Sequence, residues 1–415
     1  MSNKFLSQND PKIAKILKKE QQRQQEVLEM IPSENFVSKA VLEALGSVAT
    51  NKYAEGYPGK RYYGGCEYID QIEQTAISRA KKLFNAEHVN VQPLSGAPMN
   101  LAVYSAFCQP GDTILGMDLS HGGHLTHGHP VTLSAKIYRF VRYTCDPKTG
   151  KLDYKAIEAL AKAEKPKIVL AGFSAYSRNL NYKKFNAIAK KVGAISMMDM
   201  AHIAGLVAGK ALENPVPIMD VVTTTTHKTL RGPRGGMIMC KQKYARQIDK
   251  AVFPGLQGGP HQNQIAALAV ALHEAQKASF KKYAAQVLKN ARVLCQELQA
   301  GGLKIVFGGT DNHLILADVT PLGLSGKEAE QALDEVGITV NKNIIPNDIR
   351  KPLDPSGIRL GTPALTTRGM KEPAMKKIGQ MIIALLKNPH KISQKTAARK
   401  LVKELTQKFP LFYGV

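Results

Sequence analysis

The chemically most informative segment of this chain covers residues 221–236. Its apolar start passes into four threonines, and His227 and Lys228 then lie close in sequence to Arg231 and Arg234. Nearby positive charges push a lysine toward its neutral form, because they make its own charge less favourable. Neutral lysine is a nucleophile toward aldehydes. The segment therefore predicts a reactive lysine; a solvated lysine in a basic loop is the plainer alternative.

Two strand ends would position this lysine. Residues 223–226 read as the end of a buried strand, where open α/β sheets place their ligands. Upstream, the apolar run 194–198 ends in Asp199, and His202 follows three residues later. In pyridoxal phosphate enzymes, a carboxylate keeps the pyridinium nitrogen protonated, so that the ring can act as an electron sink. Asp199 as a helix cap and His202 as a core histidine are the alternatives.

Nine motifs along the chain resemble those of serine hydroxymethyltransferases, in the order of that family. They are MIPSEN (30–35), NKYAEGYPGKRYYGGCEY (51–68), GGHLTHG (122–128), SAYSRNL (174–180), DMAHIAGL (199–206), TTTTHKTLRGPRGG (223–236), FPGLQGGPH (253–261), NKNIIPND (341–348) and SGIRLGTPALTTRG (356–369). The resemblance covers nearly the whole length. Any one motif alone would be weak evidence.

The resemblance implies an α/β fold of the aminotransferase-like kind, known as fold type I, with a mostly parallel central sheet. It implies an enzyme that uses pyridoxal 5'-phosphate and transfers the hydroxymethyl carbon of serine to tetrahydrofolate. Glycine and 5,10-methylenetetrahydrofolate would be the products, and Lys228 would be the Schiff-base lysine.

The same resemblance assigns the site residues. The cofactor would be bound by Ser95, Gly96, Ala97, His124, Ser174, Asp199, His202, Lys228, Tyr53 and Gly259. Many relatives carry serine where this chain has Ala97, which implies one side-chain hydrogen bond fewer to the phosphate. Gly259, with Tyr53 from the neighbouring subunit, would complete the phosphate cradle.

Further assignments concern catalysis and the substrates. Catalytic roles fall to Lys228, Glu55, Tyr63, His227 and Thr225, with Glu55 as general acid and base. Arg359 would bind the amino-acid carboxylate in bidentate fashion, assisted by Ser33, beside Tyr63 and Glu55. The folate site maps onto Leu119, Gly123, Tyr62 and Asn343. Because Tyr53, Glu55 and Tyr63 are expected to act across a subunit boundary, the functional unit would be a homodimer at least.

Several alternatives stay open at this level. A threonine or allo-threonine aldolase would use the same lysine, aspartate and arginine without folate, and it is also a plausible side activity. An α-methylserine hydroxymethyltransferase and an RNA-binding paralogue with a decayed site are two more. The four histidines of HGGHLTHGH (121–129) invite a zinc interpretation, but structural zinc sites usually add cysteines or a distant second ligand pair and the catalytic pattern H-E-x-x-H is absent, so we expect no metal.

Composition limits the class of protein. No uncharged apolar run among the 415 residues approaches the roughly 18 that a membrane helix needs. The polar start lacks an apolar signal segment, which favours a cytoplasmic location. The five scattered cysteines, odd in number, indicate free thiols. A net charge of +24 makes nucleic-acid binding an open question; a lysine-rich surface or steering of polyanionic folates would account for it equally well.

Patterning predicts three parts: an N-terminal helix and arm (1–50), a large cofactor-binding domain (51–276) and a C-terminal small domain (277–415). A helix is expected over 12–30, before an arm that reaches a partner subunit. Alternating short apolar and amphipathic runs then predict strands and helices of a mostly parallel sheet. A long connecting helix is expected over 262–298, and a capping box at Ser325 and Glu328 opens a later helix.

Overall fold

A seven-stranded sheet forms the centre of the larger half of the computed structural model, which describes residues 4–412. The strand order is β4-β10-β9-β8-β7-β5-β6, and all strands are parallel except β10, which is antiparallel to both neighbours. The strands are β4 (His88–Asn90), β5 (Thr113–Met117), β6 (Arg139–Tyr143), β7 (Ile168–Gly172), β8 (Ile195–Asp199), β9 (Val221–Thr225) and β10 (Gly236–Cys240). The predicted fold class is confirmed.

Both faces of this sheet are covered, which explains its continuously apolar strands. Side chains alternate between the faces: Val169 of β7 belongs to one buried cluster and the next residue, Leu170, to another. The helices of this half are α4 (Glu67–Phe84), α5 (Gly96–Phe107), α6 (Leu133–Ile137), α7 (Tyr154–Glu164), α8 (Tyr182–Lys191), α9 (Ala204–Ala208), α10 (Ala245–Lys250) and α11 (Gln262–Ala275).

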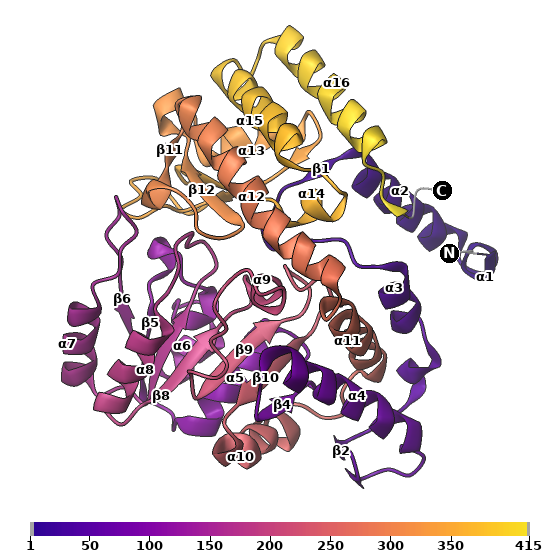
Figure 1. Ribbon diagram of the computed structural model, residues 1–415, viewed down its shortest axis with the longest axis vertical. Helices are drawn as coiled ribbons and strands as arrows, with labels where there is room; N and C mark the ends of the chain where they lie inside the picture. Colours follow the sequence, from indigo (N-terminus) through magenta and orange to yellow (C-terminus); the bar gives the residue numbers. More distant parts are fainter. Residues whose placement is uncertain (1–3, 413–415) are drawn as a thin grey trace.

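A second, antiparallel sheet lies in the C-terminal part of the chain, at the top of Figure 1. Its strands, in the order β11-β12-β15-β14, are β11 (Lys304–Ile305), β12 (Leu314–Asp318), β15 (Gly357–Gly361) and β14 (Asn341–Asn343). The helices of this part are α12 (Ala278–Ala300), α13 (Gly326–Asp334), α14 (Pro363–Thr367), α15 (Glu372–Lys387) and α16 (Ile392–Lys408). A separate apolar cluster fills the space between sheet and helices. The domain boundaries drawn from the sequence stay a prediction.

The N-terminal segment begins beside this second half and then continues to α11 of the first half. It contains α1 (Lys4–Asn9), α2 (Pro11–Glu26), β1 (Leu28–Glu29) and α3 (Lys39–Leu45). β1 pairs in parallel with β13 (Ile338–Thr339), so the chain just before the predicted arm packs on its own subunit. Arg368 donates to the carbonyls of Gln24, Val27 and Phe409, which joins the two ends of the chain. Figure 1 shows α2 beside α16 accordingly.

Three sequence-based boundaries need correction. The helix predicted over 12–30 ends at Glu26, because the chain turns into β1. The helix predicted over 262–298 is two helices, since α11 packs on α3 and α4 whereas α12 packs on α15. Strand β6, of sequence RFVRY, escaped detection because it is an edge strand with an arginine at two of its five positions.

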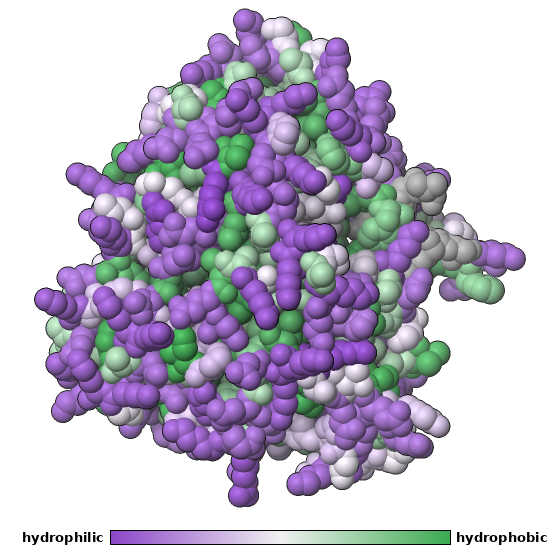
Figure 2. All heavy atoms as spheres, viewed as in Figure 1, coloured by the Kyte–Doolittle hydropathy of each residue, from purple (hydrophilic) through white to green (hydrophobic). Residues whose placement is uncertain are grey.

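Short connecting segments complete the chain. They are β2 (Gly56–Tyr57), β3 (Lys60–Arg61), η1 (Val48–Asn51), η2 (Leu119–His121), η3 (Leu125–His127), η4 (Gln242–Tyr244), η5 (Ala251–Leu256), η6 (Val306–Gly308) and η7 (Thr320–Leu322). None of the described helices is long and apolar enough to cross a membrane. On the face drawn in Figure 2, hydrophilic residues spread over the whole surface and hydrophobic residues occupy small separate areas.

Candidate active site

The carboxyl ends of β8 and β9 bring the predicted cofactor residues together. Asp199 is the last residue of β8 and pairs in register with Thr223 of β9, and Lys228 follows three residues after β9 ends at Thr225. Helix α5 begins at the same place: a Cβ added to Gly96 would lie 2.9 Å from Thr225 Cγ2. Glycine is therefore needed for helix and strand to approach this closely.

Asp199 is held as a buried carboxylate. Asn100 Nδ2 donates to its Oδ2 at 2.8 Å, His127 Nε2 lies 3.2 Å from the same oxygen, and the Ala201 amide donates to Oδ1. Burial favours the protonated acid, but the hydrogen bonds and charge of His127, with Asn100, outweigh it and hold the pKa of Asp199 well below its ordinary value. The site therefore carries a fixed negative charge.

Lys228 is buried, with 9% of its surface exposed. Burial lowers the pKa of its amine to about 8; Asp199 opposes this shift, whereas Arg359 and Arg234 add to it. The predicted effect of a nearby guanidinium is present for Arg234, and burial, which the sequence did not indicate, is the larger cause. Arg231 does not contribute to this shift: its guanidinium carbon lies 5.5 Å and 4.8 Å from the ring centres of Phe280 and Tyr283.

Three imidazoles of the site are neutral at physiological pH. Burial is the first cause in each case: it lowers the pKa of His124 to about 4 and that of His227 to about 3, and it takes His202 well below its ordinary value. Three buried polar atoms, His202 Nε2, His227 Nδ1 and Thr225 Oγ1, have no hydrogen-bond partner in the described part of the chain. Such atoms are costly unless a ligand satisfies them.

Helix α5 supplies an anion cradle. Its N-cap residue, Ser95, has extended backbone and uses its side chain for no capping hydrogen bond, so the hydroxyl is free for a ligand. The first-turn amides of Gly96 and Ala97 lie at the positive end of the helix dipole. Ala97 adds no side-chain oxygen, so the cradle consists of one hydroxyl and backbone donors.

Arg359, on β15, reaches from the second sheet toward the first. Its Nε donates to Asn341 Oδ1 at 3.0 Å and its Nη1 donates to both oxygens of Ser174 at 2.7 and 3.1 Å. Its Nη2 has no partner among the described residues and is available to a carboxylate. Burial lowers the pKa of Arg359 to about 10, which leaves it cationic. Ser33 follows Pro32, which packs against Gly361 at the end of the same strand.

Two further polar residues contact the site and were not assigned from the sequence. Asn35 donates to the Lys228 carbonyl and to Tyr283, and so fixes the backbone that carries the amine. His313 stacks on His202, with 3.4 Å between Nε2 of His313 and Nδ1 of His202. Asn35 lies in the motif MIPSEN but was given no role, and His313 lies outside all nine motifs; both are far along the chain from the residues that they contact.

A second group of predicted residues lies together around the β2–β3 hairpin. Tyr53 donates to Glu55 Oε1 at 3.3 Å, and its ring lies 4.9 Å from that of Tyr63. A Cβ on Gly259 would lie 3.4 Å from the Tyr53 ring, and one on Gly258 would lie 3.1 Å from Glu55 Oε1. No hydrogen bond or ion pair between described residues joins this group to Lys228.

The predicted folate residues are divided among three places. Leu119 and Gly123 lie in the loop after β5, beside His124, and a Cβ on Gly123 would lie 2.2 Å from the Met117 carbonyl. Asn343 lies on β14 next to the strand of Arg359. Tyr62 belongs to the second group, with its ring 5.7 Å from that of Phe253.

The residues around the ends of β8, β9 and α5 fit pyridoxal phosphate, with Asp199 and Lys228 buried and the cradle residues Ser95 and Ala97 exposed. An anion cradle suits its phosphate, Asp199 suits its pyridinium nitrogen, and the partly neutral amine of Lys228 suits its aldehyde. Ligand atoms of His124, His127 and Asp199 also lie within 4.8 Å of one another, a spacing that could hold a metal ion. Both oxygens of Asp199 already accept hydrogen bonds, which suits a carboxylate opposite an organic cation.

Comparison with known protein families gives one finding. The family model described as serine hydroxymethyltransferase matches residues 6–382. The match covers both sheets, the cradle, the buried lysine and aspartate, Arg359 and the hairpin of the second group.

Proposed function

The chain belongs to the serine hydroxymethyltransferase family, and we propose that its two groups of site residues divide the work of that reaction between two subunits. The protein is a pyridoxal-phosphate-dependent transferase. It moves the hydroxymethyl group of serine to tetrahydrofolate and leaves glycine, as a step of one-carbon metabolism. The observation that carries our assignment of residues is the buried pair of Asp199 and Lys228, one held anionic and the other held partly neutral.

The buried group binds the cofactor and the amino acid. Bound pyridoxal phosphate supplies an electron sink for negative charge that develops on the substrate. Asp199 keeps the ring nitrogen protonated, and Ser95 with the amides of Gly96 and Ala97 binds the phosphate. Lys228 would hold the cofactor through its aldehyde group, and as a neutral amine its Nζ would accept a proton.

Arg359 orients the substrate through its carboxylate. With Nε and Nη1 fixed by Asn341 and Ser174, the guanidinium plane has one orientation, and Nη2 presents its donors to the substrate. Ser33 assists from the neighbouring turn. The buried atoms without partners, in His202, His227 and Thr225, orient the ligands by hydrogen bonds.

The second group acts at the hydroxyl of serine in the other subunit's site. Tyr53 and Tyr63 are 56% and 46% exposed, although they are aromatic and lie beside Glu55. A surface of this kind suits burial against a second copy of the chain. We assign to Glu55 the removal and return of the proton at the serine Oγ, with Tyr63 beside it. We assign to Tyr53 and Gly259 the binding of the phosphate from its far side.

The lysine assignment is tested by chemical reduction. Borohydride reduces a carbon–nitrogen double bond between a lysine and the cofactor, so the cofactor should remain on the peptide that contains Lys228 and be absent from Lys228→Ala. Recovery of the cofactor on another lysine would refute the assignment.

The division of work is tested with two reactions of the holoenzyme. Glu55→Gln should lose serine cleavage but keep exchange of the glycine α-proton with solvent, because glycine has no hydroxyl for Glu55 to act on. Lys228→Ala should lose both. Equal loss of both reactions in Glu55→Gln would contradict the role of Glu55. Folate-independent cleavage of threonine or allo-threonine stays a prediction.

A further inference from the structure

The hairpin that carries Glu55 has little freedom of its own. Gly56 adopts a φ of +93°, and a Cβ at this position would lie 2.3 Å from the Lys60 carbonyl. The Tyr62 amide donates to the Glu55 carbonyl at 3.1 Å, which closes the hairpin next to Glu55. An isolated two-stranded hairpin is marginally stable in water, so its position depends on contacts beyond the two strands.

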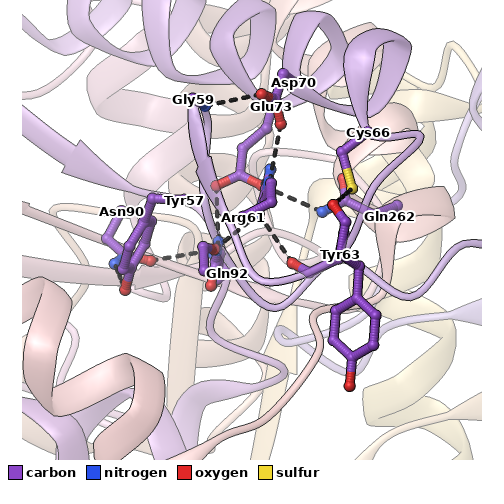
Figure 3. A network of polar contacts seen from close by, with 12 residues as sticks. Tyr57, Gly59, Arg61, Tyr63, Cys66, Asp70, Glu73, Asn90, Gln92 and Gln262 are labelled. Carbon is purple, nitrogen blue, oxygen red and sulfur yellow. Dashed lines mark hydrogen bonds and ion pairs between the residues drawn. The ribbon is translucent and has the colours of Figure 1, made fainter.

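Arg61 provides these contacts, as Figure 3 shows. Its Nη1 donates to the carbonyl of Ala54 at 2.9 Å and to that of Gly56 at 2.7 Å, which are the peptide oxygens on either side of Glu55. Its Nε donates to Asp70 Oδ1 at 2.8 Å, and Asp70 Oδ2 also accepts the amide of Gly59 at the tip of the hairpin.

Glu73, on helix α4, is the residue to which the other side chains of this network donate. Its side chain is 1% exposed and accepts from Arg61 Nη2 at 2.7 Å. Two glutamines complete its shell: Gln92 Nε2 donates to its Oε1 at 2.8 Å and Gln262 Nε2 donates to its Oε2 at 3.1 Å. Gln92 also donates to the Gly56 carbonyl at 2.9 Å, so it connects Glu73 to the hairpin a second time.

A network of this kind fixes position more than it adds stability. Burying an ion pair costs desolvation that roughly cancels its attraction, whereas shared hydrogen bonds restrict the geometry of the groups that they join. In this network every oxygen of Glu73 accepts a hydrogen bond, while the Oε1 atoms of Gln92 and Gln262 are buried without a partner among the described residues. Here the geometry that is fixed belongs to the backbone on both sides of Glu55. Helix α4, the segment just after strand β4 and helix α11 hold it through the side chains of Glu73, Gln92 and Gln262, to which we assign no contact with the substrate.

We propose that Glu73 is a positioning residue of the hydroxymethyl transfer, which acts through Arg61 to hold the Glu55 backbone in place for the neighbouring active site. This inference rests on the proposed role of Glu55. Glutamine at position 73 keeps the size of the side chain but turns an N–H₂ group toward Arg61, Gln92 or Gln262, each of which is a donor. At least one hydrogen bond of the network is then lost.

The test uses Glu73→Gln as holoenzyme, with Glu158→Gln as the matched control, since Glu158 is an acid paired with exposed lysines far from the hairpin. Hydrogen–deuterium exchange of residues 54–62 should become faster in Glu73→Gln and stay unchanged in the control. The kcat for serine cleavage should fall roughly 10- to 100-fold, as for a catalytic group displaced by about 1 Å. Exchange of the glycine α-proton and the cofactor content should stay at wild-type levels.

The double variant Glu73→Gln/Glu55→Gln separates positioning from general damage. If Glu73 acts through Glu55, adding Glu73→Gln to Glu55→Gln should change the small residual rate of serine cleavage, measured at high enzyme concentration, less than twofold, because the two losses are not additive. Full additivity, or unchanged exchange of residues 54–62, would overturn the proposal. Wild-type serine cleavage in Glu55→Gln alone would instead refute the role of Glu55, and the exchange measurement would still decide whether Glu73 holds the hairpin.

Discussion

At the scale of single residues, the reactivity of Lys228 comes from where the chain buries it. An amine that titrates at about 8 is partly neutral at physiological pH, whereas an exposed lysine is almost fully protonated. Arg234 and Arg359 add to the effect of burial, and Asp199 limits it. The lysine thus keeps its nucleophilic form available while its partner carboxylate keeps its charge.

This balance predicts a pH dependence. The rate of covalent cofactor capture by the apoprotein should rise as pH increases through about 8, because the neutral amine is the reactive form. Arg234→Gln removes a positive charge that lowers the pKa of Lys228, so its rate profile should move to higher pH. Stopped-flow absorbance measures the rate of cofactor capture against pH for both proteins. Titration of the cofactor itself affects both profiles equally, so it does not contribute to the difference between them. A shift of the variant to lower pH would contradict the electrostatic account.

The cradle allows a gain-of-affinity prediction. Ala97→Ser adds a hydroxyl at the first turn of α5, where the phosphate is expected, and should lower the Kd of pyridoxal phosphate about 5-fold, which corresponds to about 1 kcal/mol for one hydrogen bond. Equilibrium dialysis of the apoproteins measures this change. Unchanged or weaker binding would mean that the Ala97 side chain does not face the phosphate.

A site residue could be predicted from the sequence only where its own segment shows a pattern, such as the end of an apolar strand. Lys228, Asp199 and the threonines of β9 stand at strand ends within their own segments, so patterning placed them. Asn100 lies in an apolar helix and reaches Asp199 across 99 positions of the chain. Contacts of that kind follow from packing, and no local pattern of residues predicts them.

At the scale of elements, local signals were reliable where side chains satisfy the backbone nearby. The capping box of α13 is confirmed: Ser325 Oγ accepts the Glu328 amide and Glu328 accepts the Ser325 amide. The division of residues 262–298 into α11 and α12 was not predictable, because both halves favour helix. Tertiary packing against different partners decides where the break occurs.

The capping box makes a stability prediction. Ser325→Ala should lower the free energy of unfolding by about 1 kcal/mol, since it removes an N-cap acceptor. Urea unfolding measures the loss, with Ser393→Ala, at an exposed position of α16, as a control expected to change it by less than about 0.5 kcal/mol. Cofactor affinity should be unaffected, and a parallel loss of affinity would show that α13 influences the site.

At the scale of the whole molecule, charge and assembly are the two open properties. The net charge is +24, which suits long-range attraction of anionic ligands, and the face shown in Figure 2 is largely hydrophilic. Assembly bears directly on function, because no hydrogen bond or ion pair among the described residues joins the group around Glu55 to Lys228. Either Glu55 of the same chain or Glu55 of a second copy completes the active site, and we propose the second copy.

Hybrid dimers decide between these two possibilities. Lys228→Ala and Glu55→Gln should each be inactive in serine cleavage when pure. After the two variants are unfolded together, refolded and supplied with cofactor, about half of the dimers should be hybrids with one intact site each, which restores about a quarter of the wild-type activity. Recovery at this level would establish that Lys228 of one chain works with Glu55 of the other. No recovery, with hybrids present by native mass spectrometry, would contradict the shared site.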